Sequence, residues 1–227
     1  MRSPLAALRM QVRKAQGDLQ LCAEFAVKAG GITVLRGPSG AGKTTIADMI
    51  AGRATPDEGR IELSGRVLFD GRAGINLPPQ SRGLGYVFQS HRLMPHLTVE
   101  ENILFPQRFG GRTPRLKTTD LIELLGIGAL LKRWPATLSG GESQRVALAR
   151  ALAAAESMLI MDEPLASLDP DRRETLMAYI ERIPAVLPIP ILYITHSNQE
   201  TERLAEQILL IEDGRVRTSA SIKSDSD

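Results

Sequence analysis

Nine residues, GPSGAGKTT from Gly37 to Thr45, have the types and the spacing that bind the phosphates of a nucleotide. They fit the pattern G-x-x-x-x-G-K-[ST], whose glycines let the backbone curl so that successive N–H groups face one concavity. Lys43 would supply a point charge to the β- and γ-phosphates, and the Thr44 hydroxyl would be a ligand of Mg²⁺. The expected nucleotide ligands in this loop are Gly37, Pro38, Ser39, Gly40, Ala41, Gly42, Lys43, Thr44 and Thr45.

A pair of carboxylates in the segment MLIMDEP supplies the second half of such a site. After four apolar residues, Asp162 would hold the metal through water. Glu163, one residue later, would orient the attacking water or accept its proton. Such a pair is otherwise often a solvated exit from a strand, but a phosphate loop in the same chain favours the catalytic interpretation.

A third candidate segment is LSGGESQRVALARAL, from Leu138 to Leu152. Ser139 and Glu142 fit the S-x-x-E capping box, and the apolar residues that follow recur at helical spacing, so a well-capped core helix is one interpretation. However, two adjacent glycines weaken a helix start unless the backbone must approach something closely. A helix N-terminus with free N–H groups favours an anion, which is the alternative interpretation.

The surrounding elements place the phosphate loop between a strand and a helix. The run GITVLRG at 31–37 predicts the strand, and TTIADMIAG predicts a helix that ends at Gly52. This setting favours a phosphate site over an ordinary glycine-rich turn. The apolar runs SMLIMDEP and IPILYITHS resemble strands buried on both faces of a parallel sheet, and each ends in polar residues at the edge where such sheets bind ligands.

The remaining pattern predicts an α/β fold. Alternation from Asp18 to Val27 indicates a strand, residues 59–71 indicate an antiparallel hairpin turning at Ser64-Gly65, and EDGRV indicates a last hairpin turn. We expect a P-loop NTPase core with a mostly parallel sheet, an N-terminal antiparallel β subdomain and a helical subdomain inserted at about 90–137. Residues 1–220 would form one domain, and 221–227 a polar tail.

Composition excludes several classes of protein. With 28 Lys+Arg against 26 Asp+Glu, the net charge of +2 gives little reason to expect a nucleic-acid-binding surface. A single cysteine rules out an internal disulfide, and three histidines without paired cysteines make a zinc site improbable. The N-terminus does not fit a secretion signal, and we expect any membrane role to depend on a partner.

The ordered set GPSGAGKTT, Gln89, LSGGE, LIMDEP, SLD and His196 resembles the ATP-binding subunits of ABC transporters. The resemblance implies a head-to-tail dimer, in which Ser139, Gly140 and Gly141 of one subunit close over the γ-phosphate held by the other. It also implies that Gln89 contacts Mg²⁺ and the attacking water, and that His196 hydrogen-bonds the γ-phosphate. Asp169 would lie in the loop that links the two sites. The implied catalytic residues are Glu163, His196, Gln89 and Lys43, and the implied metal ligands are Thr44, Gln89 and Asp162.

Residues 77–105 are similar to importer subunits, and the segments 31–37 and 65–89 are closest in texture to molybdate or oxyanion importers. The resemblance implies a homodimer or pseudo-dimer of ATPase subunits on the cytoplasmic face of the inner or plasma membrane. Integral-membrane permease subunits would bind it directly and a solute-binding protein indirectly, with no nucleic acid involved. An apolar groove for a permease helix would be formed by Leu93, Met94, Pro95, Leu97 and Val99, with Glu100 and Glu101 at its rim.

Two departures from the family pattern affect these expectations. Met1 to Glu24 contains no aromatic residue where many members stack one on adenine, and we expect no C-terminal regulatory domain. One competing function is a soluble ABC ATPase not coupled to transport, which should show a coiled-coil insertion, a second cassette or a basic face. Another is a non-hydrolysing nucleotide switch, which should lack the carboxylate that Glu163 supplies.

Overall fold

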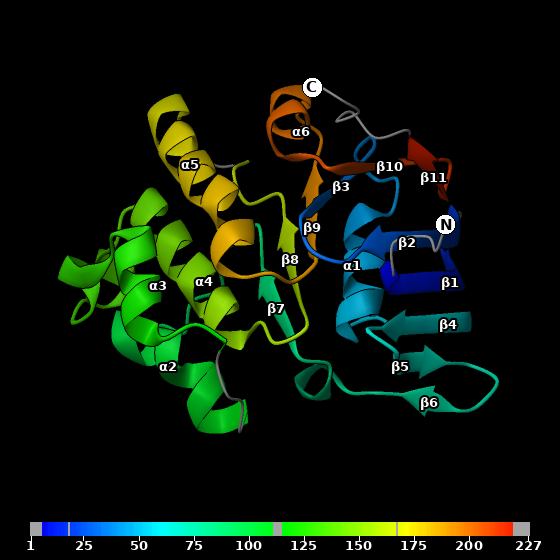
Figure 1. Cartoon of the computed structure of the whole chain (residues 1–227), viewed down its shortest axis with the longest axis horizontal. Coiled ribbons are helices and arrows are strands. Elements are labelled where there is room, and N and C mark those ends of the chain that lie inside the picture. The colour runs from blue at the N-terminus through cyan, green and yellow to red at the C-terminus, as the bar shows by residue number, and fades with distance from the viewer. Residues whose placement is uncertain (1–5, 18, 111–114, 167, 220–227) are drawn as a thin grey trace. The chain divides into compact units, whose positions relative to one another are not determined.

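The computed structural model describes residues 6–17, 19–110, 115–166 and 168–219 (Figure 1). Its contacts divide the chain into two compact units: unit 1 is Met1–Arg82 with Ile189–Asp227, and unit 2 is Gly83–Pro188. The predicted polar tail at 221–227 lies outside the described residues. So do Ser167 and Asp18, the first residue of the strand predicted at 18–27. The one-domain boundaries stay a prediction, and each unit is described by itself.

Unit 1 is built on a sheet whose first part is antiparallel. Its strands, in the order β6-β5-β4-β1-β2, are β6 (Ile75–Asn76), β5 (Arg66–Asp70), β4 (Glu58–Leu63), β1 (Ala6–Gln16) and β2 (Leu19–Lys28). The predicted hairpin is confirmed, because Leu63 pairs with Arg66 across Ser64 and Gly65, which both have positive φ. Unit 1 therefore contains the expected antiparallel β subdomain.

The second part of the unit 1 sheet is mainly parallel and holds the phosphate loop. Its strands follow β2 in the order β11 (Arg215–Ser219), β10 (Gln207–Glu212), β3 (Ile32–Arg36) and β9 (Ile191–Thr195). β3 pairs in parallel with both β10 and β9, whereas β10 and β11 form the predicted last hairpin. The buried run of β9 thus lies in a parallel sheet, as predicted, with β3 as its neighbour.

β1 was not predicted, although its residues alternate. Leu8, Met10 and Val12 are buried, while Arg9 and Gln11 between them are exposed. For this N-terminal segment, the sequence indicated only that it does not fit a secretion signal. The strand pairs with β2 on one side and β4 on the other, so the alternation is fixed by two neighbours.

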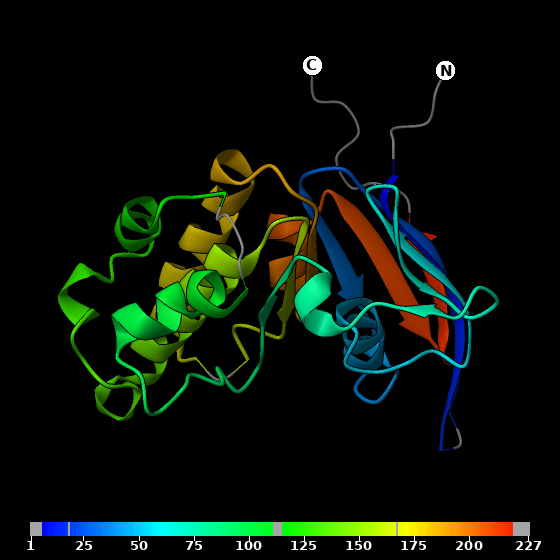
Figure 2. The same cartoon turned by 90° about the horizontal axis from the view of Figure 1, so that it is seen from below.

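The helices of unit 1 are α1 (Lys43–Ala51) and α6 (Asn198–Leu204), with a 3₁₀ turn at Pro79–Ser81. α1 lies beside the sheet of this unit (Figure 2) and buries Ile46, Met49 and Ile50 completely. It ends at Gly52 in the left-handed region (φ 78°), whose N–H bonds back to the helix. The predicted stop at Gly52 is confirmed.

Arg82 is a buried cation at the end of α1. Its Nη1 donates to the carbonyls of Met49 and Ile50, both at 2.8 Å, and its Nε donates to Leu77 O at 2.7 Å. Burial lowers the pKa of Arg82 to about 10, which still leaves the group charged at neutral pH. A cation at these last carbonyls satisfies them and complements the helix dipole.

We expect Arg82→Met to destabilise the fold by about 3 kcal/mol, because it leaves buried carbonyls without a donor and removes charge-assisted bonds. Urea unfolding of the purified protein measures this loss. Arg82→Lys, which keeps the charge but lacks the forked donors, should fall between wild type and Arg82→Met. A loss below about 1 kcal/mol for Arg82→Met would contradict this role.

Unit 2 combines two parallel strands with a group of helices (Figure 1). The strands are β7 (Leu84–Val87) and β8 (Met158–Asp162), and the helices are α2 (Val99–Gly110), α3 (Thr118–Leu125), α4 (Gly140–Ala154) and α5 (Pro170–Val186). Two 3₁₀ turns, Gly128–Leu130 and Pro135–Thr137, precede α4. The predicted helical segment 90–137 lies wholly in this unit.

α4 packs closely on β7, since a Cβ on Gly85 would lie 2.2 Å from Ala151 O. β8 is buried at all five positions, as its apolar run predicts. None of the helices in the described part of the chain combines the length and apolar character needed to cross a bilayer.

Candidate functional site

The phosphate loop in unit 1 ends at a helix without a side-chain cap. The N-cap of α1 is Gly42, with φ 99°, whereas α4, α5 and α6 are capped by the side chains of Ser139, Asp169 and Ser197. No side chain therefore takes the place of an anion at the start of α1. This arrangement fits the phosphate groups that the sequence predicts there.

Close packing explains two glycines of the loop. A Cβ on Gly37 would lie 2.3 Å from Ile211 O, and one on Gly42 would lie 2.3 Å from Leu21 Cδ1. The loop is thus held against β10 and β2. Gly40 differs, because a Cβ there meets nothing within 4 Å while φ is 79°, so its turn faces open space.

Lys43 is buried and folded back onto its own loop. Its Nζ donates to Gly37 O at 2.9 Å and to Pro38 O at 2.8 Å. An ammonium group has three donors, so these two bonds position the charge and leave one N–H for a phosphate oxygen. Thr44, the predicted metal ligand in this unit, is exposed.

His196 follows β9 and shares a cavity of about 410 Å³ with Gly37 and Pro38. The two segments meet because β3 and β9 are parallel neighbours, with Arg36 opposite Thr195 at their carboxyl ends. The remaining lining residues are Arg36, Leu210, Ile211 and Glu212. Unit 1 therefore brings His196 to the beginning of the phosphate loop.

Glu200 was missed by sequence reasoning. Although it lies on α6, its Oε2 accepts hydrogen bonds from Thr195 Oγ1 at 2.6 Å and Tyr193 OH at 3.0 Å. The buried carboxylate therefore fixes the end of β9 just before His196. The S-x-x-E spacing from Ser197 predicts a helix start, but gives no sign of this second use.

The two carboxylates of unit 2 lie at the end of β8. Asp162 is buried, and its Oδ2 accepts a hydrogen bond from Tyr86 OH at 3.4 Å. Glu163 is partly exposed and has φ 46°, a left-handed conformation that is uncommon for a residue with a side chain. The backbone therefore changes direction between the two groups, as their separate predicted roles require.

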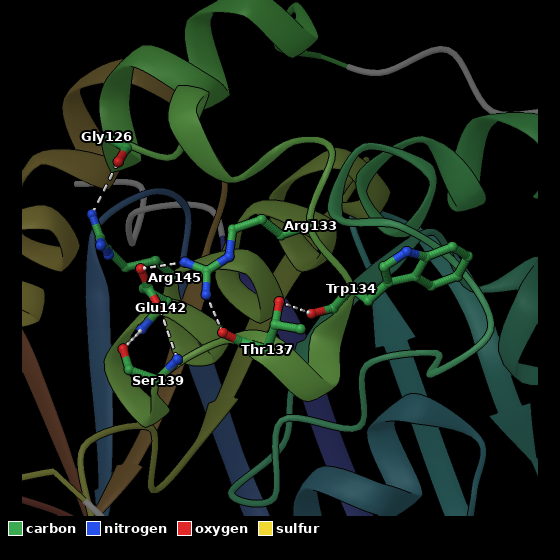
Figure 3. A network of polar contacts seen from close by, with 7 residues as sticks. All are labelled: Gly126, Arg133, Trp134, Thr137, Ser139, Glu142 and Arg145. Carbon is green, nitrogen blue, oxygen red and sulfur yellow. Dashed lines mark hydrogen bonds and ion pairs between the residues drawn. The ribbon is translucent and has the colours of Figure 1, made fainter.

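The turn before α4 forms the predicted capping box (Figure 3). Ser139 Oγ accepts from Glu142 N at 3.3 Å, and Glu142 Oε2 accepts from Ser139 N at 2.7 Å. The bond from Ser139 N is the main cause that lowers the pKa of Glu142, and Arg133 adds an ion pair at 3.2 Å. The hydroxyl of Ser139 therefore accepts from the helix, while the Glu142 carboxylate closes the box from the other side.

The Ser139–Gly141 turn is presented outward by this network. Ser139 and Gly140 are exposed, and a Cβ on Gly140 would meet nothing within 4 Å. Arg133 also donates to Thr137 O (Figure 3). Glu142 and Arg133 therefore fix the turn before α4, and Ser139 and Gly140 stay exposed, whereas Gly141 lies close to Arg172.

The other predicted residues of unit 2 are also placed. Gln89, which follows β7, is exposed, and Asp169 caps α5 while pairing with Arg172 at 3.2 Å. Unit 2 thus holds Gln89, Ser139, Gly140, Gly141, Asp162 and Glu163, whereas unit 1 holds the phosphate loop and His196.

The predicted apolar groove needs one correction. Val99 is fully buried at the start of α2, so it cannot belong to a docking surface. Pro95 is exposed, and Leu93, Met94 and Leu97 are half-buried. Asn102, which was not predicted, is buried and binds Met94 N, Met94 O, Leu97 O and Thr98 O.

Of the predicted rim pair, Glu100 is exposed, whereas Glu101 accepts from Thr98 N and Thr98 Oγ1. The docking role of this segment stays a prediction.

Comparison with known proteins decides the family. Residues 22–166 match the ABC transporter family. The molybdenum import ATP-binding protein ModC of Paramagnetospirillum magneticum is 48% identical over 96% of this chain and 60% of its own length. That of Rhodospirillum rubrum is 49% identical over 95% and 58%. The chain belongs to the ABC transporter family.

The fold agrees with this assignment. The ATP-binding cassette MJ0796, solved as a dimer in a post-hydrolysis state with ADP and Pi, matches with a TM-score of 0.79 at 25% identity. The match covers 96% of this chain and 100% of that one. The predicted α/β cassette fold is confirmed, and the chain spans about three fifths of the length of the curated relatives it matches.

None of the residues of β1 is aromatic, and its second half carries the polar side chains of Arg13, Lys14 and Gln16. Arg13 forms an exposed ion pair with Glu58, and Lys14 donates to Thr55 O at 2.8 Å. Gln16, at the end of β1, instead accepts from Thr45 Oγ1 at 2.7 Å, in the first turn of α1. The end of β1 is therefore tied through Gln16 to the helix that follows the predicted phosphate loop.

Stacking on an aromatic side chain is worth about 1–3 kcal/mol per base. Without such a side chain, nucleotide binding should depend mainly on the phosphates. We expect ATP and GTP to bind within about tenfold of each other, a difference of about 1.4 kcal/mol. Gln16→Tyr should tighten ATP binding about tenfold, and Arg13→Tyr, on the opposite face of β1, should change little. Equilibrium titration measures both; a preference for ATP above a hundredfold in the wild type would contradict this view.

Proposed function

We propose that this chain is the ATP-hydrolysing subunit of an ABC importer and works as a head-to-tail dimer. The observation that carries the proposal is the outward-facing Ser139–Gly141 turn at the start of α4. The chain thus has an uncapped helix start that suits phosphate and a second exposed helix start with a glycine pair. In the dimer, the Ser139–Gly141 turn contacts the nucleotide that is bound to the second copy of the chain.

The chemistry follows from the side chains. Lys43 and the N–H groups at the start of α1 bind the β- and γ-phosphates, and His196 hydrogen-bonds the γ-phosphate. Glu163 takes a proton from water as its oxygen attacks the γ-phosphorus, and the bond to the bridging oxygen breaks to release ADP. Ser139, Gly140 and Gly141 of the partner stabilise the charge on the transferred phosphate.

Mg²⁺ fits the donors present, because Thr44, Gln89 and Asp162 offer only hydroxyl, amide and carboxylate oxygens, which this hard cation prefers. When bound, it would neutralise charge on the phosphates. The residues of this chain would otherwise position the water and the γ-phosphate.

The transported solute is proposed to be molybdate or another oxyanion. The two ModC relatives support this assignment, since each is named for molybdenum import. The ATPase dimer would bind permease subunits on the cytoplasmic face of the membrane, and a solute-binding protein would act through the permease.

Deletion of the gene, followed by measurement of cellular molybdenum at low external molybdate, tests the function. Wild-type protein should restore uptake and co-purify with a permease from membranes, whereas Lys43→Ala should not restore uptake. Normal uptake in the deletion strain, together with a protein recovered only away from membranes, would favour the soluble ATPase instead.

A further inference from the structure

The proposed general base is held in a strained conformation. Glu163 has φ 46° and precedes a proline, which further restricts its backbone. Such a conformation persists only where the surroundings over-determine it. A turn bond from Ala166 N to Glu163 O at 3.2 Å is one restraint, but it comes from the same loop.

Gln144 on α4 supplies a restraint from outside the loop. Its Nε2 donates to Pro164 O at 2.6 Å, and its side chain is almost fully buried, with 1% exposed. Its Oε1 is also buried and has no hydrogen-bond partner among the described residues. A buried amide with one strong bond and one unsatisfied acceptor is costly, which points to a role beyond packing.

α4 joins this restraint to the Ser139–Gly141 turn, hereafter the signature turn. The helix runs without a break from Gly140 to Ala154, so Gln144 lies little more than one turn after Ser139. The start of the helix is fixed by its capping box. Any displacement of the Ser139–Gly141 turn is therefore carried to the carbonyl of Pro164, the residue next to Glu163.

We propose that Gln144 is a positioning residue, which sets the orientation of Glu163 according to the nucleotide bound at the signature turn of its own subunit. This inference rests on the proposed roles of Glu163 and Ser139. In the dimer, the signature turn touches the partner's nucleotide, while Glu163 acts on the subunit's own. Gln144 thus makes each general base responsive to the occupancy of the other site.

Gln144→Met tests the proposal, since methionine has similar length and removes both the donor and the unsatisfied acceptor. We expect kcat to fall about 10–100-fold, the scale of a misplaced catalytic group. The Kd for ATP, the urea midpoint and the ATP-dependent dimer should stay near wild type. Arg145→Met is the matched control, because Arg145 also donates from α4 to carbonyls, those of Leu125 and Gly126, away from Glu163. It should retain wild-type kcat.

The decisive measurement combines Gln144→Met with Glu163→Gln. Residues that act as a unit are non-additive, so the double variant should be no slower than Glu163→Gln alone. An equal further loss in the double variant, or loss of the dimer in Gln144→Met, would overturn the positioning role. If Glu163→Gln alone leaves kcat unchanged, the proposed function fails instead.

Gln144→Glu provides a second measurement, the pH dependence of kcat, which a merely structural role of Gln144 would not change. The ionised carboxylate cannot donate to Pro164 O, but the protonated form can. Relative to wild type at each pH, its kcat should recover as the pH is lowered toward 5.5. A constant ratio across the pH range would count against the proposal and, if Gln144→Met fails to fold, would decide against it.

Discussion

We expect Glu163→Gln to slow ATP hydrolysis by about 10² or more and to leave ATP binding intact, because the amide keeps the shape of the side chain but cannot accept a proton. The strained backbone at this position should be kept, since neither the turn bond from Ala166 nor the bond from Gln144 to Pro164 involves the substituted atoms. The ATP-bound dimer should therefore accumulate.

Steady-state turnover and size-exclusion chromatography with Mg·ATP measure the two effects. Glu202→Gln, an exposed substitution of the same kind on α6, serves as the control and should behave as wild type. A Glu163→Gln protein that binds ATP yet stays monomeric at high concentration would contradict the dimer mechanism.

Ser139→Arg is expected to abolish turnover and spare ATP binding to the monomer. Ser139 lies at an exposed helix start in unit 2, so a long cation there should block the approach of a second subunit, and the residues of the phosphate loop in unit 1 are unchanged. It also removes the N-cap of α4, which costs about 1 kcal/mol of stability, too little to unfold a protein of this size.

Mixing Ser139→Arg with Lys43→Ala sharpens this test. In a head-to-tail pair, one composite site carries both substitutions and the other carries neither, so part of the activity should return. ATP titration of Ser139→Arg alone provides the check: failure of the monomer to bind ATP would show that Ser139 acts on its own subunit's nucleotide.

Local sequence patterns predicted much of the fold, because the correctly predicted elements depend on burial and spacing within a few neighbouring residues. β8 and β9 are short runs buried at every position, β3 is buried at all but Arg36, and α1 ends where Gly52 adopts a left-handed conformation. The capping box at Ser139 needs only residues three apart, so sequence spacing was enough.

Other features depend on distant partners, which spacing does not show. Gln144 binds a carbonyl twenty residues away, and Arg82 binds carbonyls in α1. An apolar residue such as Val99 suits either a docking groove or a core, and only the packing of unit 2 shows that it is buried. The hydrogen bond between Gln16 at the end of β1 and Thr45 in α1 likewise joins residues that are far apart in the sequence.

The position of β3 between β9 and β10 has a consequence for how the protein is made (Figure 1). The phosphate loop leaves the ribosome before both strands that flank β3, which come much later in the sequence, as does Ile211, against which Gly37 packs. Such distant pairings form late and slowly. The sheet around the phosphate loop is therefore complete only after residues 191–212 have been synthesised, and ATP, which stabilises only a state that binds it, favours chains that include them.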